Sequence, residues 1–148
     1  MNAWQVIKII FIGLIHLRKR QNHVVRRSIN ASKSRQWLSV IIRLVIDEIR
    51  QKISRGKFEF SQHAVDQSIL RHITLQELRQ VIASGEIIEN YPDDKYGPSC
   101  LIFGITQTGR PVHIQCSDSS RPLIKVITLY EPDPEHWIDF KVRRTSHD

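Results

Sequence analysis

Apolar residues that follow Trp37 recur at helical spacing and predict a helix over about residues 38–54. The positions that set this period are Val40, Ile41, Leu44, Val45, Ile49 and Ile53. Gly56 follows shortly afterwards, and a glycine just past the last apolar position is a common helix stop. The pattern therefore predicts one long helix that ends before Gly56.

Two shorter helices are predicted by their capping residues. Ser61 is a good N-cap for a helix over about residues 62–71. Thr74 and Glu77 have the spacing of a capping box, which predicts a third helix over about residues 75–84. Three helices are thus expected before the first strand.

Four segments in the second half of the chain predict strands: Glu86–Tyr91, Cys100–Thr106, Val112–Ser117 and Leu123–Tyr130. Their connections are short and contain ordinary turn residues, which favours an antiparallel meander. In the tail, residues 132–140 are expected to form one helical turn, with Trp137 packed against the body. Because helices come first and strands follow, the fold class is α+β, with N-terminal helices packed on one face of a four-stranded, mainly antiparallel sheet.

The two central strands are expected to pair through a turn at residues 107–110. In that register Thr106 opposes Pro111, and Gly104 opposes His113. His113 would then stand on a polar sheet face beside a glycine, with open space above the imidazole. This arrangement predicts a candidate site at His113.

Other polar side chains are expected on the same sheet face. Gln115 alternates with the apolar residues of its strand as His113 does, and Tyr130 joins this side if the last two strands pair in register. Two plainer interpretations stay open. His113 is then a partly buried histidine bonded to a neighbouring strand, and Tyr130 is an interfacial tyrosine.

The second predicted helix has a polar flank and an apolar flank. At about 100° per residue, His63, Gln67 and Arg71 lie within about 80° of one another. The opposite flank, which is expected to pack on the sheet, holds Ala64, Val65, Ser68 and Ile69. The polar flank offers an imidazole, an amide and a guanidinium for a site, and the alternative is a capping histidine with a solvent-exposed arginine.

No sequence motif supports a metal site. The chain has no Cys-x-x-Cys or His-Glu-x-x-His spacing. His113 and Cys116 differ by three positions along a strand and so point to opposite faces. A serine nucleophile on an elbow turn and a phosphate-binding glycine loop are absent as well. We therefore expect neither a metal nor another cofactor.

The two cysteines are not expected to form a disulfide. In the register described above, Cys100 and Cys116 point to opposite faces of the sheet. A reducing cytoplasm is the simplest compartment for such a chain.

Residues 4–15 are apolar at all but two positions, and a basic run follows at residues 16–20. A membrane-spanning helix needs about 20 apolar residues, so no stable membrane insertion is expected. A secretory signal carries its positive charge before the apolar run rather than after it. Three interpretations stay open: a membrane-touching amphipathic helix, an additional packed helix, or a segment without a structural role that arises from a start codon placed too far upstream.

The basic charge is concentrated in the first part of the chain. The chain has 148 residues, of which 25% are charged and 41% hydrophobic, as in a soluble globular protein with a core. Residues 1–60 carry 13 Lys and Arg against 3 Asp and Glu, whereas residues 61–148 carry 9 against 12. Residues 18–36 have the composition of a disordered basic tether, which suits an acidic partner such as RNA or DNA. We expect a basic extension over residues 1–36 and a single domain over residues 37–148.

Several short motifs stand in a fixed order within residues 58–144. They are His63-Ala64, Arg71-His72-Ile73-Thr74, Gly85-Glu86-Ile87-Ile88-Glu89-Asn90-Tyr91, Gly109-Arg110-Pro111-Val112-His113, Thr128-Leu129-Tyr130-Glu131-Pro132-Asp133 and Trp137. In this order and spacing they resemble the bacterial domain-of-unknown-function 4258 family. That family is similar to the RelE and MqsR class of toxins that cleave messenger RNA. Its members often stand beside a small zinc-finger antitoxin of the MqsA type.

By this resemblance, the chain is expected to be a RelE/MqsR-like cytoplasmic endoribonuclease that uses no metal. A base takes the proton of a ribose 2′-hydroxyl, which attacks the adjacent phosphate, while a cation stabilises the added charge and an acid protonates the leaving 5′-oxygen. His63 or His113 is expected to be the base, and the other histidine or Tyr130 the acid. Arg71 would hold the scissile phosphate, because a guanidinium matches two phosphate oxygens.

Further RNA contacts are expected from Gln67 and Gln115, and from Arg143 and Arg144 near the C-terminus. The slightly acidic balance of residues 61–148 opposes tight RNA binding. A ribosome-bound messenger RNA or the basic leading segment would offset this.

Three functional hypotheses follow. The first is a metal-independent endoribonuclease toxin of a type II toxin–antitoxin system, restrained by a cognate antitoxin. The second is a non-catalytic protein- or RNA-binding module in which His63, Arg71 and Tyr130 only recognise a partner. The third is a membrane-surface protein docked by residues 4–20.

Overall fold

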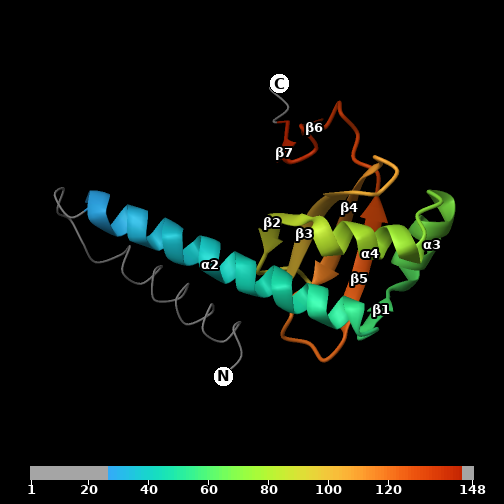
Figure 1. The fold of residues 1–148 in the computed structure, drawn as a ribbon, viewed down its shortest axis with the longest axis horizontal. Helices are drawn as coiled ribbons and strands as arrows, with labels where there is room; N and C mark the ends of the chain where they lie inside the picture. Colours follow the sequence, from blue (N-terminus) through green and yellow to red (C-terminus); the bar gives the residue numbers. More distant parts are fainter. Residues whose placement is uncertain (1–26, 145–148) are drawn as a thin grey trace. The chain divides into compact units, whose positions relative to one another are not determined.

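The computed structural model describes residues 27–144 (Figure 1). Its elements are, in chain order, α2 (Arg27–Ser54), β1 (Phe58–Phe60), α3 (Gln62–Leu70), α4 (Leu75–Ser84), β2 (Glu86–Tyr91), β3 (Ser99–Ile105), β4 (Pro111–Ser117), β5 (Ile124–Tyr130), β6 (Trp137–Ile138) and β7 (Val142–Arg143). The described residues fall into two units that divide after Asp47, and α2 contributes to both. Every candidate site residue belongs to the second unit.

The predicted caps determine where α3 and α4 begin. The Ser61 hydroxyl accepts a hydrogen bond from the backbone N–H of Ala64, and this caps α3. Thr74 and Glu77 form the predicted capping box at the start of α4, in which each side chain accepts from the other's backbone N–H. Both helices therefore start at the positions that the sequence predicts.

α2 begins earlier in the chain than the apolar pattern predicts. It starts at Arg27, so residues 27–36 are helical, although we expected a disordered tether there. The apolar segment at residues 4–15 and the basic run at residues 16–20 lie outside the described residues. Among the described helices, none combines the length and the apolar character that a membrane crossing requires.

The sheet has five strands in the order β1-β5-β4-β3-β2, one more than predicted. The four predicted strands are present and pair as an antiparallel meander, so the α+β class is confirmed. The additional strand, β1, runs parallel to β5, with Phe58 opposite Ile124. Because β1 spans only residues 58–60, it is too short to produce a detectable period in the sequence.

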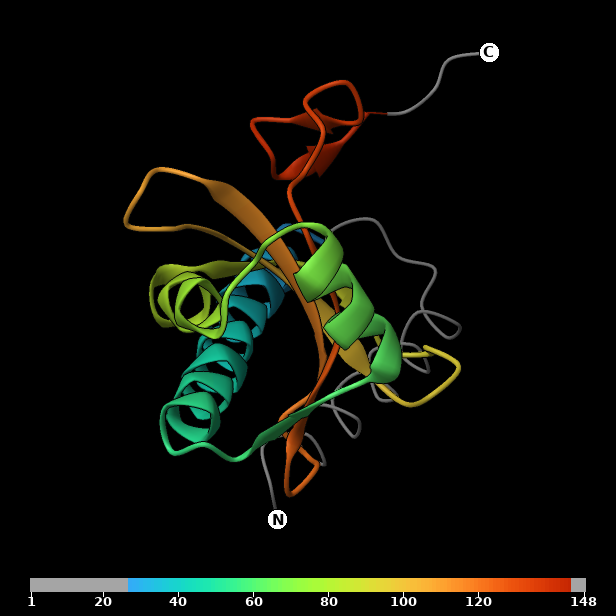
Figure 2. The same ribbon diagram turned by 90° about the vertical axis from the view of Figure 1, so that its right-hand side faces the viewer.

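Helices lie on both faces of the sheet, whereas we expected them on one face. Figure 2 shows α3 and α4 on opposite sides of the strands. The end of α2 lies beside α4, because the Arg50 guanidinium donates to the backbone carbonyls of Ile82 at 3.1 Å and Gly85 at 2.7 Å. α4 and the end of α2 therefore share one face, and the other face receives α3.

The pairing of β3 with β4 differs from the predicted register by one residue. Phe103, rather than Gly104, lies opposite His113. A shift of one residue exchanges the side chains that meet on each face of a sheet. The imidazole is consequently covered by an aromatic ring, and the open space that we expected beside it is absent.

The turn between β3 and β4 causes this difference. The backbone N–H of Thr106 donates to the Arg110 carbonyl at 2.9 Å, which closes a loop at residues 107–109. Gly109 adopts a φ of +85°, the left-handed conformation that favours glycine. Three-residue hairpin loops commonly contain such a residue, whereas we assumed a four-residue turn.

The same register brings the two cysteines together. Cys100 and Cys116 are direct cross-strand partners on one face, so the prediction that they point to opposite faces is wrong. Both are buried and free. A hydrogen bond with the Cys100 thiol, together with burial, raises the pKa of Cys116. The Cys116 thiol is therefore protonated at neutral pH and unreactive.

The C-terminal segment folds back over the sheet as a small hairpin of β6 and β7. Before β6, the Trp137 N–H donates to the Asp133 carbonyl at 3.0 Å, and this bond between residues four apart closes the single helical turn predicted within residues 132–140. Trp137 is buried, as predicted. Its ring lies edge-on to the imidazole of His113, so the hairpin covers this part of the sheet.

Replacing Gly104 by Ala is expected to destabilise the protein, because α4 crosses directly over this position. A Cβ at residue 104 would stand 2.8 Å from the carbonyl oxygen of Val81 and 3.1 Å from its Cα. We expect a loss of about 3 kcal/mol or more in the free energy of unfolding, measured by urea denaturation. Gly109→Ala is the control, because nothing lies within 4 Å of that position. Only backbone strain of about 1–2 kcal/mol applies there; equal losses in the two variants would contradict this packing.

Candidate functional site

His113 is fully enclosed, with none of its surface exposed. Its Nε2 lies 2.6 Å from the carbonyl oxygen of Phe140, and its Nδ1 lies 3.1 Å from the hydroxyl of Tyr130. A carbonyl oxygen only accepts hydrogen bonds, so Nε2 carries the proton. In a neutral imidazole the other nitrogen is then an acceptor, and the Tyr130 hydroxyl donates to Nδ1.

The surroundings of His113 favour its neutral form. The rings of Phe103, Tyr130 and Trp137 meet the imidazole edge-to-face, with centroids 5.7, 5.1 and 4.5 Å away. Burial lowers the pKa of His113, although the hydrogen bond to the Phe140 carbonyl raises it. The imidazole is thus a core group whose hydrogen bond connects it to the partly exposed Tyr130.

Tyr130 stands at the end of β5, opposite His113, which confirms the predicted face. Burial raises the pKa of Tyr130. Among the nearby charges, Arg143 and Arg71 lower this pKa, while Glu89 raises it. The hydroxyl is therefore protonated at neutral pH and lies in the field of two guanidinium groups.

Arg143 reaches this region from the C-terminal hairpin. Its Nε lies 2.9 and 3.2 Å from the two carboxylate oxygens of Glu89, and its Nη2 lies 3.4 Å from the Tyr91 hydroxyl. The guanidinium also lies over the Trp137 ring, 4.6 Å from its centroid. Burial and the hydrogen bond to Glu89 raise the pKa of Tyr91 to about 12. Glu89 thus offsets the positive charge of Arg143.

The predicted polar flank of α3 forms a row along the helix. His63 and Arg71 are exposed, and Gln67 between them is partly buried. The Nε of Arg71 donates to Oε1 of Gln67 at 2.7 Å. His63 stands about 12 Å along the helix axis from Arg71, because eight residues separate them at about 1.5 Å each.

The apolar flank of α3 does not pack on the sheet as we expected. Ala64 is buried, but Val65 is exposed and Ile69 is 68% exposed. The helix is anchored at its start, where the Ser61 hydroxyl donates to the Ile127 carbonyl at 2.8 Å. Its smallest side chain faces inward, which allows the helix backbone to approach the sheet closely.

All four residues predicted to contact RNA are engaged within the protein: Gln67 with Arg71 and Arg143 with Glu89, as described above, and Gln115 and Arg144 as follows. The Nε2 of Gln115 donates to Asp94 and to Ser99, with both distances 3.1 Å. The Nε of Arg144 donates to the Pro134 carbonyl at 3.2 Å.

At the end of β5, His113 and Tyr130 are hydrogen-bonded, Arg143 lies over the neighbouring Trp137 ring, and the charge of Arg71 acts on Tyr130 by lowering its pKa. His63 stands at the opposite end of α3 from Arg71. The roles that we assigned to all these residues stay predictions, and we name the group at the end of β5 the Tyr130 cluster.

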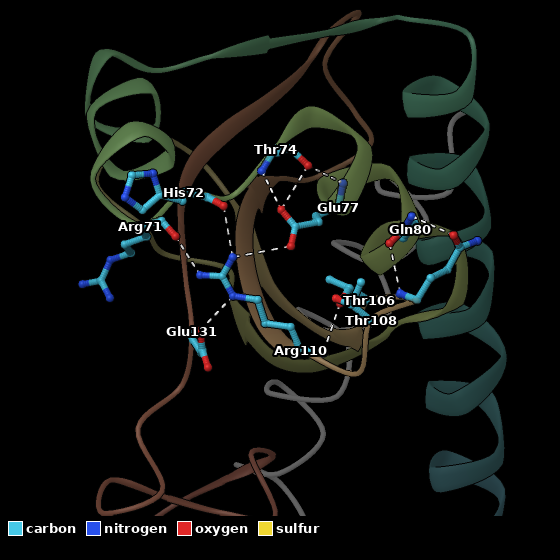
Figure 3. Close-up of polar contacts among 10 residues, drawn as sticks. Arg71, His72, Thr74, Glu77, Gln80, Thr106, Thr108, Arg110 and Glu131 are labelled. Carbon is cyan, nitrogen blue, oxygen red and sulfur yellow. Dashed lines mark hydrogen bonds and ion pairs between the residues drawn. The ribbon is translucent and has the colours of Figure 1, made fainter.

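Sequence analysis missed Arg110, which holds the loop that carries Arg71 (Figure 3). Its Nη2 donates to the Arg71 carbonyl at 2.7 Å, and its Nη1 donates to the His72 carbonyl at 3.1 Å. Its Nε lies 2.8 Å from Glu131, and its Nη1 lies 3.4 Å from Glu77. Because these partners come from distant parts of the chain, no local spacing reveals them. The only sequence signal is the Gly-Arg-Pro turn that contains Arg110.

The described residues include no group of three His, Cys, Asp or Glu side chains that could hold a metal ion. An open pocket lies between α4 and the turn after β3, and its lining includes Gln76, Arg79, Gln80 and Gln107. It contains none of the predicted site residues. The candidate site is therefore the Tyr130 cluster rather than this pocket.

Residues 60–131 match the model of a protein family described as Domain of unknown function (DUF4258), and this part of the chain belongs to that family. The match confirms the family that the sequence motifs indicate. It covers the four predicted catalytic residues and Arg110, and it ends before the β6–β7 hairpin. No curated protein and no solved structure matches the chain.

Stability is expected to fall as the pH falls below about 6.5, the usual pKa of histidine in an unfolded chain. Burial lowers the pKa of His113 in the native state, so the unfolded chain binds more protons in this range. The free energy of unfolding then rises with pH, by at most about 1.4 kcal/mol per pH unit for one group. Urea unfolding at about pH 7.5 and about pH 5.5 measures the effect.

His113→Asn should lose less stability between these two pH values than the wild type. His63→Asn, which removes an exposed imidazole instead of the enclosed one, is the control. Identical pH dependence in the wild type and His113→Asn would mean that His113 is not a buried neutral group.

Proposed function

We propose that this chain is a metal-independent endoribonuclease that cleaves messenger RNA by attack of a 2′-hydroxyl. The observation that supports this proposal is the pairing of Tyr130 with His113: a partly exposed hydroxyl donates to a buried, neutral imidazole. Such a pair passes a proton from a bound substrate to the imidazole nitrogen. Arg71 and Arg143 supply positive charge at the same place.

In the proposed reaction, the ribose 2′-hydroxyl gives its proton to the Tyr130 oxygen while the Tyr130 proton moves to Nδ1 of His113. The 2′-oxygen attacks the phosphorus, the bond from phosphorus to the 5′-oxygen breaks, and that oxygen takes a proton from water, because His63 stands at the far end of α3. The products are a 2′,3′-cyclic phosphate and a 5′-hydroxyl. His113 then returns its proton to solvent through Tyr130.

Two features stabilise the imidazolium that this step creates. The Phe140 carbonyl accepts the Nε2–H of His113, and this bond and the charge of Glu89 both raise the pKa of His113. Once Nδ1 is protonated, it donates back to the Tyr130 oxygen, so both N–H groups have acceptors. Burial opposes the charged form, which favours rapid return of the proton after cleavage.

Arg71 is the proposed phosphate ligand. Its side chain is bonded to Gln67, and no carboxylate of the described residues lies within ion-pair distance of it. Arg143, by contrast, is paired with Glu89. A guanidinium that is not paired with a carboxylate is able to form two parallel bonds to a phosphate and to stabilise the charge that develops during attack.

The resemblance to RelE and MqsR extends this proposal to a biological role. The chain would be the toxin of a type II toxin–antitoxin system in the cytoplasm, acting on free or ribosome-bound messenger RNA. A cognate antitoxin, of the zinc-finger type, would restrain it. The basic segment within residues 1–60 would supply the RNA affinity that the acidic balance of residues 61–148 lacks.

A non-catalytic protein- or RNA-binding module is the second candidate, and the enclosure of His113 favours it. Both ring nitrogens already have partners, and three aromatic rings surround the imidazole, as in a core histidine that only supports the fold. In that case Tyr130 and Arg71 would recognise a partner without chemistry.

Tyr130→Phe is expected to slow RNA cleavage by about 10²–10³-fold, because it removes the hydroxyl that relays the proton. Arg71→Ala should cause a similar loss, because it removes the cation at the phosphate. The assay follows an end-labelled oligoribonucleotide in the presence of EDTA and identifies the terminal groups of the products. Tyr96→Phe is the matched control, because Tyr96 is exposed in the loop between β2 and β3. This variant should cleave RNA at the wild-type rate.

The result also separates the two candidates. RNA that the wild type binds through Arg71 and Tyr130 but leaves intact would favour the binding module. Cleavage that is as fast in Tyr130→Phe as in the wild type would contradict the proposed site. A substrate with a single 2′-deoxyribose at the cleaved position should resist the enzyme, since the attacking group is missing.

A further inference from the structure

Arg110 binds the C-terminal end of α3. Its Nη2 donates to the Arg71 carbonyl at 2.7 Å and its Nη1 to the His72 carbonyl at 3.1 Å. The last carbonyl groups of a helix have no partner within the helix, and a cation there interacts favourably with the helix dipole. Arg110 therefore holds the backbone from which the Arg71 side chain extends.

The same guanidinium connects two other elements, as Figure 3 shows. Its Nε lies 2.8 Å from Oε2 of Glu131, the residue that directly follows Tyr130. Its Nη1 lies 3.4 Å from Oε1 of Glu77, whose other oxygen accepts from the Thr74 N–H at the start of α4. One side chain thus joins the end of α3, the start of α4 and the end of β5.

The loop that Arg110 holds has a strained backbone. His72 adopts a φ of +51°, in the left-handed region that residues other than glycine rarely enter. Such a conformation persists only where the surrounding structure determines it. Here the N–H groups of His72 and Ile73 bond to the carbonyls of Ile69 and Ser68, as at many helix ends. The bonds from Arg110 to the carbonyls of Arg71 and His72 add a second constraint.

We propose that Arg110 is a positioning residue, which holds Arg71 beside Tyr130 so that one phosphate meets both side chains. This inference rests on the proposed function. Arg110 does not bind the phosphate itself, because its nitrogens already serve the two carbonyls and two carboxylates described above. It connects α3, which carries Arg71, to the strand that ends at Tyr130.

A guanidinium suits this position better than an ammonium group. Its donors are spread over three nitrogens in a rigid plane, whereas a lysine presents all its donors on one nitrogen. Arg110→Lys keeps the positive charge but is unable to span these acceptors, and Arg110→Gln loses both the charge and the span. Comparing the two variants separates charge from geometry.

Amide hydrogen exchange of the full chain tests the positioning directly. The backbone N–H groups of residues 71–73 bond to the carbonyls of Gln67, Ile69 and Ser68 and close the last turn of α3. In Arg110→Gln these three amides should exchange on the order of tenfold faster, while the amides of the central strands keep their protection. Arg121→Gln, which removes a guanidinium from an exposed loop, is the control and should match the wild type.

If Arg110→Gln fails to fold, Arg110→Lys and Glu131→Gln provide the same readout. Both should loosen residues 71–73, because each removes part of the network. Exchange at residues 71–73 that stays at the wild-type rate in these variants would overturn the proposal.

A double-mutant cycle tests whether Arg110 acts through Arg71. Arg110→Gln should lower kcat at least tenfold in the wild-type background and cause no further loss in Arg71→Ala, because the group that it positions is already gone. Full additivity of the two losses would overturn the inference, since it would indicate a general effect on the fold. If the wild type cleaves no RNA, the proposed function fails, and the exchange measurement alone decides whether Arg110 positions Arg71.

Discussion

The left-handed conformation of Gly109 is the constraint from which the arrangement of the site follows. It closes the turn between β3 and β4 over residues 107–109 and thereby determines which residue of β3 faces each residue of β4. Phe103 is placed against the imidazole of His113, and Arg110 leaves the turn directed at the end of α3. A turn longer by one residue would place Gly104, rather than Phe103, opposite His113.

Two hydrogen-bond systems meet at the end of β5 as a result. One is buried and runs from the Phe140 carbonyl through His113 to the Tyr130 hydroxyl. The other is partly exposed and runs from Glu131 through Arg110 to the end of α3. Because Tyr130 and Glu131 are neighbours in the chain, the end of the strand connects the buried imidazole of His113 to the guanidinium of Arg110. In the proposed reaction, the first system would supply the base, and the second would hold the backbone that carries the cation, Arg71.

Local sequence signals predicted the parts of this structure that depend on local interactions. Ser61 and Thr74 gave the helix starts because capping involves residues only three positions apart. Strand alternation placed Tyr130 on the side of His113. The features that were missed depend on contacts between distant residues: the side of the sheet that α3 covers, the parallel strand β1, and the partners of Arg110. The register error had one local cause, the length of the turn. A turn that is one residue too long shifts the predicted partner of every residue in β3 and β4 by one position.

The central claim is that Tyr130 donates a hydrogen bond to a buried, neutral His113. Two-bond ¹H–¹⁵N correlation spectra of the imidazole test it most directly, recorded across the pH range in which histidine normally titrates. The structure requires a proton on Nε2, an unprotonated Nδ1 with the shift of a hydrogen-bond acceptor, and a change at Nδ1 when Tyr130 is replaced by Phe. A proton on Nδ1, or titration near the usual pKa of about 6.5, would contradict this account.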